Sequence, residues 1–435
     1  MGQKSINIVG GGFTGLSLGY YLSKAGWKVS IFEKDEDIAG LAGSFKIGNS
    51  SLEKFYHHWF TNDIFINEIV KNLKLEDNLI VRPTKTGMYF ANNFFKLSTP
   101  FDLLKFNPLN LFQRIRLGLV VVAVRFVNNW MELEKKTAKE WLTKICGQKG
   151  YEIVWEPLLK GKFGRYADEV SAVWFWNKLK LRGGSRSENG SENLLYYKGG
   201  FSSLANSIKT SIESNGGKIY CQAEVTELVS ANEIKLKDHT VHSANYTILT
   251  TALPICANLL SNIQPKEYLD NLNKVIYLGN TCLVLELTKS LSDLYWINVN
   301  EPNFPFVGVI EHTNFEPKES YEGKHIVYLS KYLPTDEALY SYSKEEFYNY
   351  SLPFIKQMFP EFDESIVSNY YLWKEKYSQP LVTKFYSKFI ANIQPNIENV
   401  YINSMAQIYP EDRGTNYAIR EGKKMAEMLI SKEQE

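Results

Sequence analysis

Three glycines near the N-terminus have the spacing of a pyrophosphate-binding turn. Gly10, Gly12 and Gly15 follow an apolar stretch and lead into a helical pattern. The first glycine of such a turn lets the chain reverse, the second lets the backbone approach phosphate oxygens, and the third lets helix and strand pack closely. The first amides of the helix, which include those of Phe13 and Thr14, would then bind the phosphates.

An acidic residue follows at the distance expected for a contact with ribose. Residues 29–32 predict a second strand, and Glu33 ends it, 18 residues after Gly15. A carboxylate at this place can accept hydrogen bonds from both ribose hydroxyls. The strand, turn, helix, second strand and acidic end together predict a βαβ unit that binds a dinucleotide. A glycine-rich turn in a βαβ unit of another kind is the alternative.

A second pair of glycines, in the segment that runs from Glu33 to Gly43, narrows the choice of nucleotide. This segment resembles the extension found in FAD proteins of the amine oxidase, protoporphyrinogen oxidase and phytoene desaturase superfamily. There, a short loop wraps beneath the FAD phosphates and ribityl chain, and glycines allow close backbone approach. The resemblance implies FAD as the cofactor. The residues that it assigns to FAD in this segment are Glu33, Lys34, Gly40, Leu41, Ala42 and Gly43.

The C-terminal part of the chain carries a second resemblance to the same superfamily. Gly414, Thr415 and Asn416 open a long helical pattern after a predicted strand. In the superfamily, this helix points its first amides at the flavin ring and stabilises negative charge there. The usual Gly-Asp after the strand is Ser404-Met405 here, so the side chain that reaches the ribityl chain stays open. The resemblance also gives Val225 a backbone contact with the adenine, and it implies that FAD is held non-covalently.

Two adjacent histidines, His57 and His58, follow the nucleotide-binding unit among aromatic residues. The superfamily places residues near the flavin here, so both are catalytic candidates that donate a hydrogen bond or proton, and His58 is the preferred one. Half-buried histidines bonded to carbonyls are the alternative. The segment from His58 to Asp63 is also similar to the His-x-Phe-His-Thr-Asn segment of UDP-galactopyranose mutases, with Phe60 in place of the second histidine. Tyr377, in a segment similar to one that crosses near the flavin, is the third candidate, as a residue that stacks on the substrate.

Three cations stand close together in the middle of the chain. Lys160, Lys162 and Arg165 lie within six residues. Such a group is suited to bind a phosphate on the substrate, and Lys160 and Arg165 are the predicted substrate residues. A solvated, charged loop is the alternative.

Composition limits the classes of function. Lys and Arg number 49 against 48 acidic residues, for a net charge of +1, so no global field attracts nucleic acid. The four cysteines lie far apart and predict buried thiols in a reducing compartment. The N-terminus leads straight into the first strand, and no apolar run is long enough to span a membrane. We therefore expect a cytoplasmic protein with a small-molecule substrate, no nucleic-acid partner and no metal site; the oligomeric state stays open.

Residues 101–130 mix apolar side chains with basic ones. Such a segment can lie on a membrane surface, and several relatives in the superfamily dock on membranes through helices of this kind. A buried helix with arginines at its ends is the alternative, which the short apolar run from Leu117 to Val124 favours. The basic residues are Lys105, Arg114, Arg116 and Arg125.

The expected fold is α/β, with a Rossmann-like FAD-binding domain of the GR2 type and an interleaved α+β substrate domain. The FAD-binding domain is predicted to consist of residues 1–60, 195–260 and 385–435. The substrate domain is predicted to consist of residues 61–194 and 261–384, with a helical part at about 101–180.

The expected function is that of an FAD-dependent oxidoreductase. Its substrate would be apolar, isoprenoid-like, an amine or lipid-linked, and would transfer hydride to flavin N5. The alternative is a flavin-dependent mutase or isomerase of a nucleotide- or lipid-linked sugar, with no net redox change. A flavin-binding protein without turnover is a third reading, suggested by Ser404-Met405.

Overall fold

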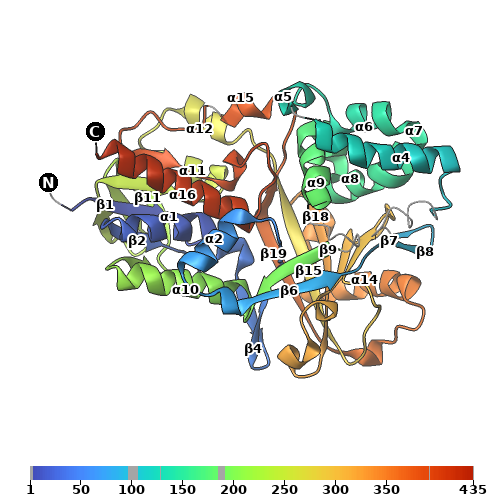
Figure 1. Ribbon diagram of the computed structural model, residues 1–435. Coiled ribbons are helices and arrows are strands. Elements are labelled where there is room, and N and C mark those ends of the chain that lie inside the picture. The colour runs from blue at the N-terminus through green and yellow to red at the C-terminus, as the bar shows by residue number, and fades with distance from the viewer. Residues whose placement is uncertain (1–2, 97–105, 128, 185–191, 391, 435) are drawn as a thin grey trace.

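The structure is a computed structural model that describes residues 3–96, 106–127, 129–184, 192–390 and 392–434 (Figure 1). Its elements form two lobes. One lobe is built on a parallel sheet and contains both ends of the chain, and the other combines a mixed sheet with a group of helices. No helix in the described part of the chain is long and apolar enough to cross a membrane.

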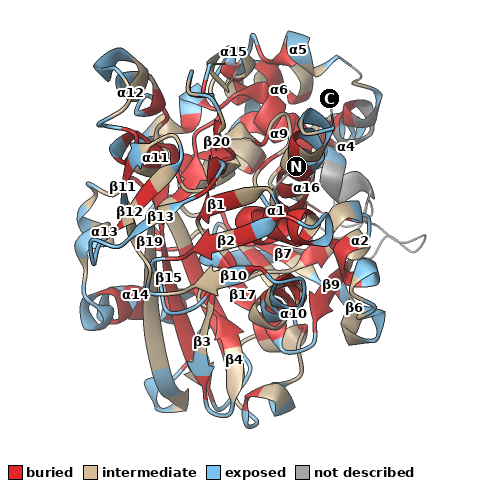
Figure 2. Cartoon of the chain, turned by 90° about the vertical axis from the view of Figure 1, so that its left-hand side faces the viewer, coloured by how far each residue is buried: buried red, intermediate tan, exposed pale blue. Residues whose placement is uncertain are grey.

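The parallel sheet has its first strand at the centre. From edge to edge its strands are β10 (Lys218–Tyr220), β2 (Lys28–Phe32), β1 (Ser5–Val9), β14 (Tyr246–Leu249) and β20 (Val400–Ile402). The inner strands are buried on both faces, as their apolar sequences require (Figure 2). The strand order changes direction beside β1, and ligands of open α/β sheets bind at the carboxyl ends of the strands at such a point.

Different layers cover the two faces of this sheet. The first layer consists of α1 (Phe13–Lys24), α10 (Gly200–Ser214) and α16 (Thr415–Lys432), with α2 (Ile64–Asn72) against α16. The second layer consists of β11 (Val225–Ser230), β12 (Glu233–Leu236), β13 (Val241–Ser243), α11 (Leu253–Leu259) and α12 (Lys266–Leu272). Because α1 and α16 both follow strands of the parallel sheet, both begin at its carboxyl edge.

The helices α1 and α16 touch through their backbones. A Cβ atom on Gly422 would lie 2.5 Å from the carbonyl oxygen of Thr14 and 2.8 Å from the amide nitrogen of Leu18. Only glycine allows this approach, which fixes the start of α16 relative to the start of α1.

The second lobe is organised around a seven-stranded sheet in which only the pair β16–β7 is parallel. Its strands in order are β19 (Val367–Pro380), β15 (Tyr277–Leu287), β18 (His325–Leu333), β17 (Gly308–Glu311), β16 (Trp296–Val299), β7 (Thr86–Phe90) and β8 (Asn93–Lys96). The helices α13 (Ala338–Ser341) and α14 (Lys344–Met358) contact this sheet.

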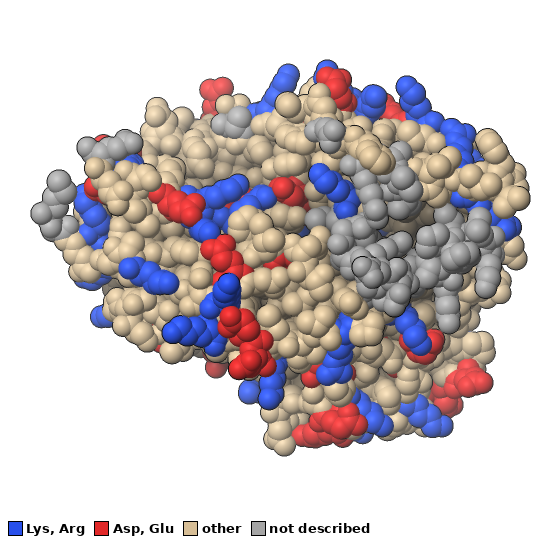
Figure 3. All heavy atoms as spheres, viewed as in Figure 1, with Lys and Arg blue, Asp and Glu red and all other residues tan. Residues whose placement is uncertain are grey.

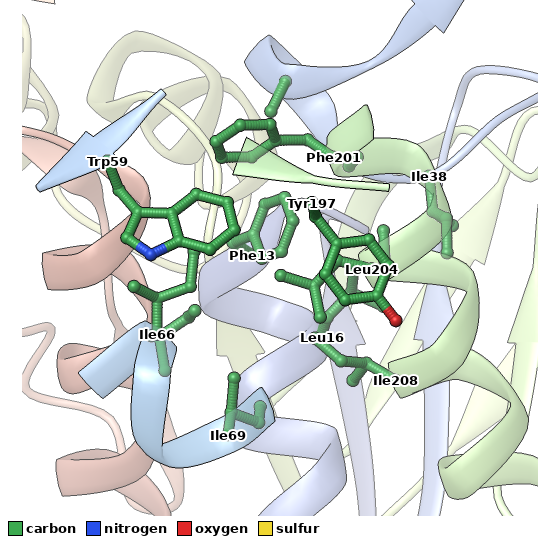
Figure 4. Close-up of a cluster of buried hydrophobic side chains, with 14 of the residues drawn as sticks. Phe13, Leu16, Ile38, Trp59, Ile66, Ile69, Tyr197, Phe201, Leu204 and Ile208 are labelled. Atoms are coloured by element: carbon green, nitrogen blue, oxygen red, sulfur yellow. The ribbon is translucent and has the colours of Figure 1, made fainter. Parts of the chain in front are cut away.

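Two small antiparallel sheets join the lobes. They are β5 (Trp59–Phe60), β9 (Glu192–Tyr197) and β6 (Leu79–Thr84), and the hairpin of β3 (Ser44–Ile47) and β4 (Ser50–Glu53). The Trp59 ring lies 5.3 Å from the ring of Phe201 at the start of α10, and Phe13 of α1 contacts Phe201 as well (Figure 4). This contact holds the segment before β5 against the nucleotide-binding lobe.

A helical group completes the second lobe. Its helices are α4 (Leu111–Ala123), α5 (Trp130–Leu133), α6 (Ala138–Cys146), α7 (Gln148–Gly150), α8 (Glu156–Phe163) and α9 (Ala172–Gly184), and α15 (Tyr386–Ile390) packs nearby. Helix α6 begins with a capping box of Thr137 and Glu140. Residues 101–130 were predicted to lie either on a membrane surface or in a buried helix. Of these, residues 101–105 and 128 are outside the described residues.

The predicted α/β fold, with a Rossmann-like parallel sheet and an interleaved α+β part, is confirmed. The exact boundaries of the two domains stay a prediction.

Candidate active site

The glycine-rich turn has the geometry that its spacing predicts. Gly10 has a positive φ of +114°, and a Cβ on Gly15 would lie 2.1 Å from the carbonyl oxygen of Gly10. Gly15 therefore packs α1 directly against the turn. A Cβ on Gly12, in contrast, would meet no heavy atom of the described residues within 4 Å. Gly12 thus faces open space at the carboxyl end of β1.

Two helix N-termini begin beside this turn. Gly12 caps α1 and Gly414 caps α16, and no side chain among the described residues bonds to either cap position. A Cβ on Gly414 would also meet no heavy atom within 4 Å in the described structure. The amides of Phe13 and Thr14 start α1, and the N-terminus of each helix favours negative charge.

Glu33 follows β2 and lies beside the glycine turn. Its carboxylate accepts hydrogen bonds of 2.7 Å from the amide of Gly11 and 3.0 Å from the amide of Asp35. Burial raises the pKa of Glu33 above its ordinary value, although these amides act in the opposite direction. The neighbouring Lys34 is exposed. The carboxylate is therefore held at the end of β2 by backbone groups, where a ribose hydroxyl can reach it.

The second glycine loop packs on the first. The amide of Ala39 donates to the carbonyl oxygen of Gly11 over 2.9 Å. Gly40 has a φ of +56°, and a Cβ there would lie 3.3 Å from the Cα of Gly12. The short turn Gly40–Ala42 follows, with Leu41 half-buried and Ala42 and Gly43 buried.

These features fit FAD. Two uncapped helix starts supply amides for anionic or electron-rich oxygens, Gly12 and Gly414 leave room for a close approach, and Glu33 offers a carboxylate for the ribose. Val225, the predicted backbone contact for the adenine, begins β11 and is half-buried. All four cysteines are free thiols.

Asn416 has a side-chain role that the sequence did not reveal. Its Oδ1 accepts hydrogen bonds from the amides of Phe65 (2.9 Å) and Ile66 (3.1 Å) in the first turn of α2. The side chain therefore caps α2, while the backbone of Thr415 and Asn416 stays at the start of α16. Asn416 thus ties α2 to the start of that helix.

Ser404 and Met405, which stand where the expected motif has Gly-Asp, form the start of a short turn. Ser404 starts a short turn, Met405–Gln407, through a reciprocal hydrogen-bond pair with Gln407. The next buried carboxylate along the chain is Asp412, 5% exposed, just before α16. A buried carboxylate is thus present just before α16, at Asp412.

Asp412 connects three elements. Its Oδ2 lies 2.6 Å from the Nζ of Lys178 on α9, and its Oδ1 accepts a hydrogen bond of 3.1 Å from Gln379 on β19. Burial alone would raise the pKa of Asp412, but Lys178, Lys162 and Arg413 outweigh burial and hold the pKa below its ordinary range. Asp412 is therefore ionised at neutral pH.

Arg413 and Lys162 share an aromatic neighbour. The guanidinium of Arg413 donates to the hydroxyl of Tyr332 over 2.8 Å, and the Nζ of Lys162 lies 4.9 Å from the centre of the Tyr332 ring and 4.7 Å from that of Trp174. The Nε of Arg413 is buried and has no hydrogen-bond partner among the described residues. A buried donor of this kind is costly unless a ligand bonds to it. We define the cation cluster as Lys162, Lys178 and Arg413.

The two histidines point to different places. The Nδ1 of His57 donates to the carbonyl oxygen of Phe55 over 2.6 Å, and its ring lies 5.1 Å from that of Phe201. The Nδ1 of His58 instead contacts the hydroxyl of the buried Tyr295 at 2.8 Å, in the substrate lobe. Neighbouring residues of an extended chain point to opposite sides, which explains the divergence.

His57 is neutral and has a defined tautomer. Burial lowers its pKa to about 4, with Arg413 as a smaller cause in the same direction. Because the carbonyl oxygen of Phe55 can only accept, Nδ1 carries the proton and Nε2 is left as an acceptor.

Tyr377 lies on β19, two residues before Gln379, where the register between β19 and β15 shifts. Its ring lies 5.4 Å from that of Tyr277, whose hydroxyl accepts a hydrogen bond from the amide of Leu253 at the start of α11. Tyr377 thus stands where β19 passes the parallel sheet.

The predicted substrate residues Lys160 and Arg165 have partners on the protein surface. Lys160 pairs with Glu156 at 2.9 Å on the same helix, and the Nη2 of Arg165 donates to both carboxylate oxygens of Asp336. Of the three cations grouped in the sequence, Lys162 is the one directed toward Asp412. A phosphate-binding role for Lys160 and Arg165 stays a prediction.

Fold and site together define an FAD-binding protein with a nucleotide-binding lobe and a second lobe. The chain belongs to the family of flavin containing amine oxidoreductases, whose pattern matches residues 13–430. It is therefore an FAD-dependent oxidoreductase.

Solved structures support the fold over the whole chain. A protein described as a protoporphyrinogen oxidase, from Exiguobacterium sp. 255-15, is 16% identical, with 99% of each chain covered and a TM-score of 0.76. A reduced UDP-galactopyranose mutase is 14% identical, with 99% of this chain and 96% of that chain covered and a TM-score of 0.78. Cyclohexylamine oxidase from Brevibacterium oxydans is 12% identical, with both chains fully covered and a TM-score of 0.71.

Sequence reasoning missed the residues of the second lobe that meet the C-terminal motif. Lys178 follows the aromatic residues Trp174, Phe175 and Trp176, and its local sequence does not distinguish it from the neighbouring Lys180. Asp412 and Arg413 had a signal, because a charged pair directly before a glycine-capped helix is unusual for an exposed loop.

Proposed function

We propose that the protein oxidises an apolar, isoprenoid-like or lipid-linked substrate that carries an anionic group. FAD, when bound, supplies the hydride acceptor at its N5 position. The observation that carries the proposal is the cation cluster. Lys162, Lys178 and Arg413 surround the carboxylate of Asp412, and Lys178 also acts on the buried Asp63, so cations outnumber carboxylates here. The excess of positive charge lies beside an aromatic surface formed by Tyr332 and Trp174.

The cluster separates the substrate classes that the family suggests. An ammonium group would meet like charges here, and removing it from water would add to the cost. A phosphate or carboxylate would meet cations and the unpaired Nε of Arg413. An amine is therefore the least favoured class. The rings of Tyr332 and Trp174 suit an apolar part next to the anionic one.

Of the two histidines, His57 is the better candidate for a hydrogen bond with the substrate. Its Nε2 is an acceptor, it is neutral at physiological pH, and Arg413 acts on its pKa, which indicates that the two groups are close. It would accept a hydrogen bond from a substrate hydroxyl beside the carbon that loses hydride. His58 is engaged with Tyr295, and its role stays a prediction, as does that of Tyr377.

The first test uses anaerobic absorbance spectroscopy of the FAD-loaded protein. Polyprenyl phosphates, fatty acids and primary amines are added in turn, and loss of the flavin band near its visible maximum reports oxidation of the compound. We expect bleaching with an anionic lipid and none with an amine. Bleaching by amines alone would contradict the proposal.

The second test compares lysines. Lys162→Met should raise the KM for the anionic substrate at least tenfold, because a charge-assisted contact is lost. Lys160→Met, on the same helix, is the matched control and should leave the KM unchanged, since Lys160 pairs with Glu156 at the surface. A raised KM for Lys160→Met together with an unchanged KM for Lys162→Met would instead support Lys160 and Arg165 as the substrate-binding residues.

A flavin-dependent mutase or isomerase of a nucleotide- or lipid-linked sugar is the second candidate. The cation cluster favours it equally, because such a substrate carries a phosphate or pyrophosphate. The redox behaviour separates the two functions. Conversion of a sugar substrate that requires prior reduction of the flavin, with no net consumption of reductant, would favour the mutase, and bleaching of the oxidised flavin by substrate would favour the oxidase.

A further inference from the structure

Helix α4 and the segments that follow it expose a continuous series of large apolar side chains. We call these side chains the docking face. Its members, with the exposed fraction of each, are Leu111 (62%), Phe112 (73%), Ile115 (49%), Leu119 (62%), Phe126 (76%) and Met131 (60%). Soluble surfaces rarely gather so many large apolar side chains within one short segment.

Helix α4 carries apolar side chains on its exposed side as well as on its buried side. Leu117, Val120 and Val124 are buried against the helical group, whereas Leu111, Ile115 and Leu119 recur at a spacing of four residues on the outer side. The sequence-based alternative of a buried helix therefore holds for the inner face only. The outer face has no packing function within the described structure.

The charge of the segment is one-sided. No Asp or Glu occurs from residue 103 to residue 131. The basic residues with described side chains in that interval are Arg114 and Arg116, which are half-buried and donate to the carbonyl oxygens of Leu109 and of Lys144 and Ile145. In the view of Figure 3, the upper right-hand end of the molecule, where α4 lies, shows Lys and Arg side chains among uncharged ones. A surface of apolar and basic groups matches an anionic lipid headgroup layer, whose acyl region takes the apolar side chains.

We propose that the docking face binds the surface of an anionic membrane, with α4 lying in the plane of the headgroups. The helix has 13 residues, which corresponds to a length of about 20 Å. It is too short to cross a bilayer, and this agrees with the absence of a spanning helix among the described residues. The contact is therefore peripheral.

The docking face is connected to the cation cluster by a short structural path. The indole Nε1 of Trp176 on α9 donates to the carbonyl oxygen of Val124, directly after α4, over 3.1 Å. The same helix α9 carries Trp174 and Lys178, which contact Lys162 and Asp412. A molecule that leaves the lipid layer at the docking face thus starts one helix away from the proposed substrate-binding residues.

The test is vesicle flotation with the full FAD-loaded protein. Vesicles of phosphatidylcholine alone are compared with vesicles that also contain phosphatidylglycerol. We expect the wild type to float with the anionic vesicles and to bind them at least tenfold more weakly when salt is raised to 1 M or when the vesicles are neutral. Failure of the wild type to float with either kind would overturn the proposal.

Variants assign the binding to the docking face. Phe112→Glu combined with Leu119→Glu should reduce the bound fraction at least tenfold, whereas Val241→Glu combined with Met428→Glu should behave as the wild type. The control residues are also exposed and apolar, at 49% and 41%, but lie on β13 and α16. Equal loss in both pairs would contradict the assignment. If the first pair fails to fold, Phe126→Ser combined with Met131→Ser serves the same purpose.

Another occupant of the face would give a different result. If the wild type forms dimers in sedimentation experiments, floats with no vesicle, and becomes monomeric with Phe112→Glu, the face is an interface between copies of the chain and the proposal is wrong. FAD content and reduction by dithionite should be unchanged in all variants, so failure here is distinguishable from failure of the proposed oxidation.

Discussion

The carboxylate of Asp412 and the ammonium group of Lys178 form an ion pair of 2.6 Å between residues that are far apart in the chain. The pair joins the segment before α16 to α9, so it spans the boundary between the nucleotide-binding lobe and the helical group. Gln379 adds a third element to the same carboxylate. The relative position of the cofactor motif and the substrate lobe is thus fixed by a polar contact as well as by apolar packing.

Breaking this pair should weaken both stability and substrate binding. Lys178→Met leaves Asp412 ionised and buried with fewer partners, and since Lys178 itself is 39% exposed we expect a loss of about 2 kcal/mol, below the range for fully buried pairs. Urea unfolding at pH 7 measures it. Lys180→Met, which alters an exposed lysine on the same helix, is the control. A Lys178→Met protein as stable as the wild type would show that the pair contributes nothing.

The lowered pKa of Asp412 sets the pH range of this effect. The folded-state pKa lies below the unfolded one, so the contribution of the pair is present above about pH 4 and is lost as the pH falls toward the folded-state pKa. The difference in stability between the wild type and Asp412→Asn should therefore shrink on acidification.

Two glycines of the same turn should respond differently to alanine. Gly12→Ala should cost at most about 1 kcal/mol of stability, because its Cβ meets no heavy atom within 4 Å in the described structure, yet it should weaken FAD binding at least tenfold because the space faces the phosphates. Gly15→Ala places a Cβ 2.1 Å from the carbonyl oxygen of Gly10 and should cost about 3 kcal/mol.

The measurements for this pair are thermal unfolding of the apoprotein and titration with FAD. Wild-type FAD affinity of Gly12→Ala would exclude a phosphate site beside Gly12. Wild-type stability of Gly15→Ala would mean that α1 can move away from the turn.

Asn416 should act through α2 and not only through the cofactor. Asn416→Ala removes the acceptor for two amides in the first turn of α2 and should cost about 1–2 kcal/mol, as the loss of a helix cap does. Asn416→Asp keeps an acceptor and adds a charge that the helix N-terminus favours, so it is the matched control and should stay near wild-type stability. Equal destabilisation by both would contradict the capping role.

The parts of the fold that the sequence predicted are those set by local spacing. The strand, glycine turn, helix and Glu33 occupy one continuous segment, and their geometry follows from backbone limits at Gly10 and Gly15. The cation cluster could not be found in this way, because Lys162, Lys178 and Arg413 meet only through the packing of α8, α9 and the segment before α16. In the sequence, a lysine looks the same whether it is solvated or faces a buried carboxylate.

His57 and His58 show a second limit of prediction from the sequence. His57 and His58 are equivalent as sequence, and the alternation of side chains in an extended segment predicts only that they diverge. Which of them faces the cofactor side depends on the contacts of Trp59 with Phe201 and Asn67, which fix the rotation of the segment. Burial then decides the charge state of His57, and burial is a property of the folded chain.

His57 should make the stability of the protein depend on pH between about pH 6.5 and pH 4. Its folded-state pKa of about 4 lies below the unfolded value of about 6.5. The unfolded chain therefore binds a proton more readily, and stability falls as the pH drops from about 6.5 toward 4. The expected loss attributable to His57 at pH 4.5, relative to pH 7, is about 2 kcal/mol.

His57→Gln cannot be protonated and should lack this component, although the amide can still donate to the carbonyl oxygen of Phe55. Urea unfolding of both proteins at the two pH values gives the difference, with His239→Gln, at an exposed turn, as the control. If His57→Gln retains the full acid sensitivity of the wild type, His57 is already protonated in the folded protein and its Nε2 is not the acceptor that the proposed oxidation requires.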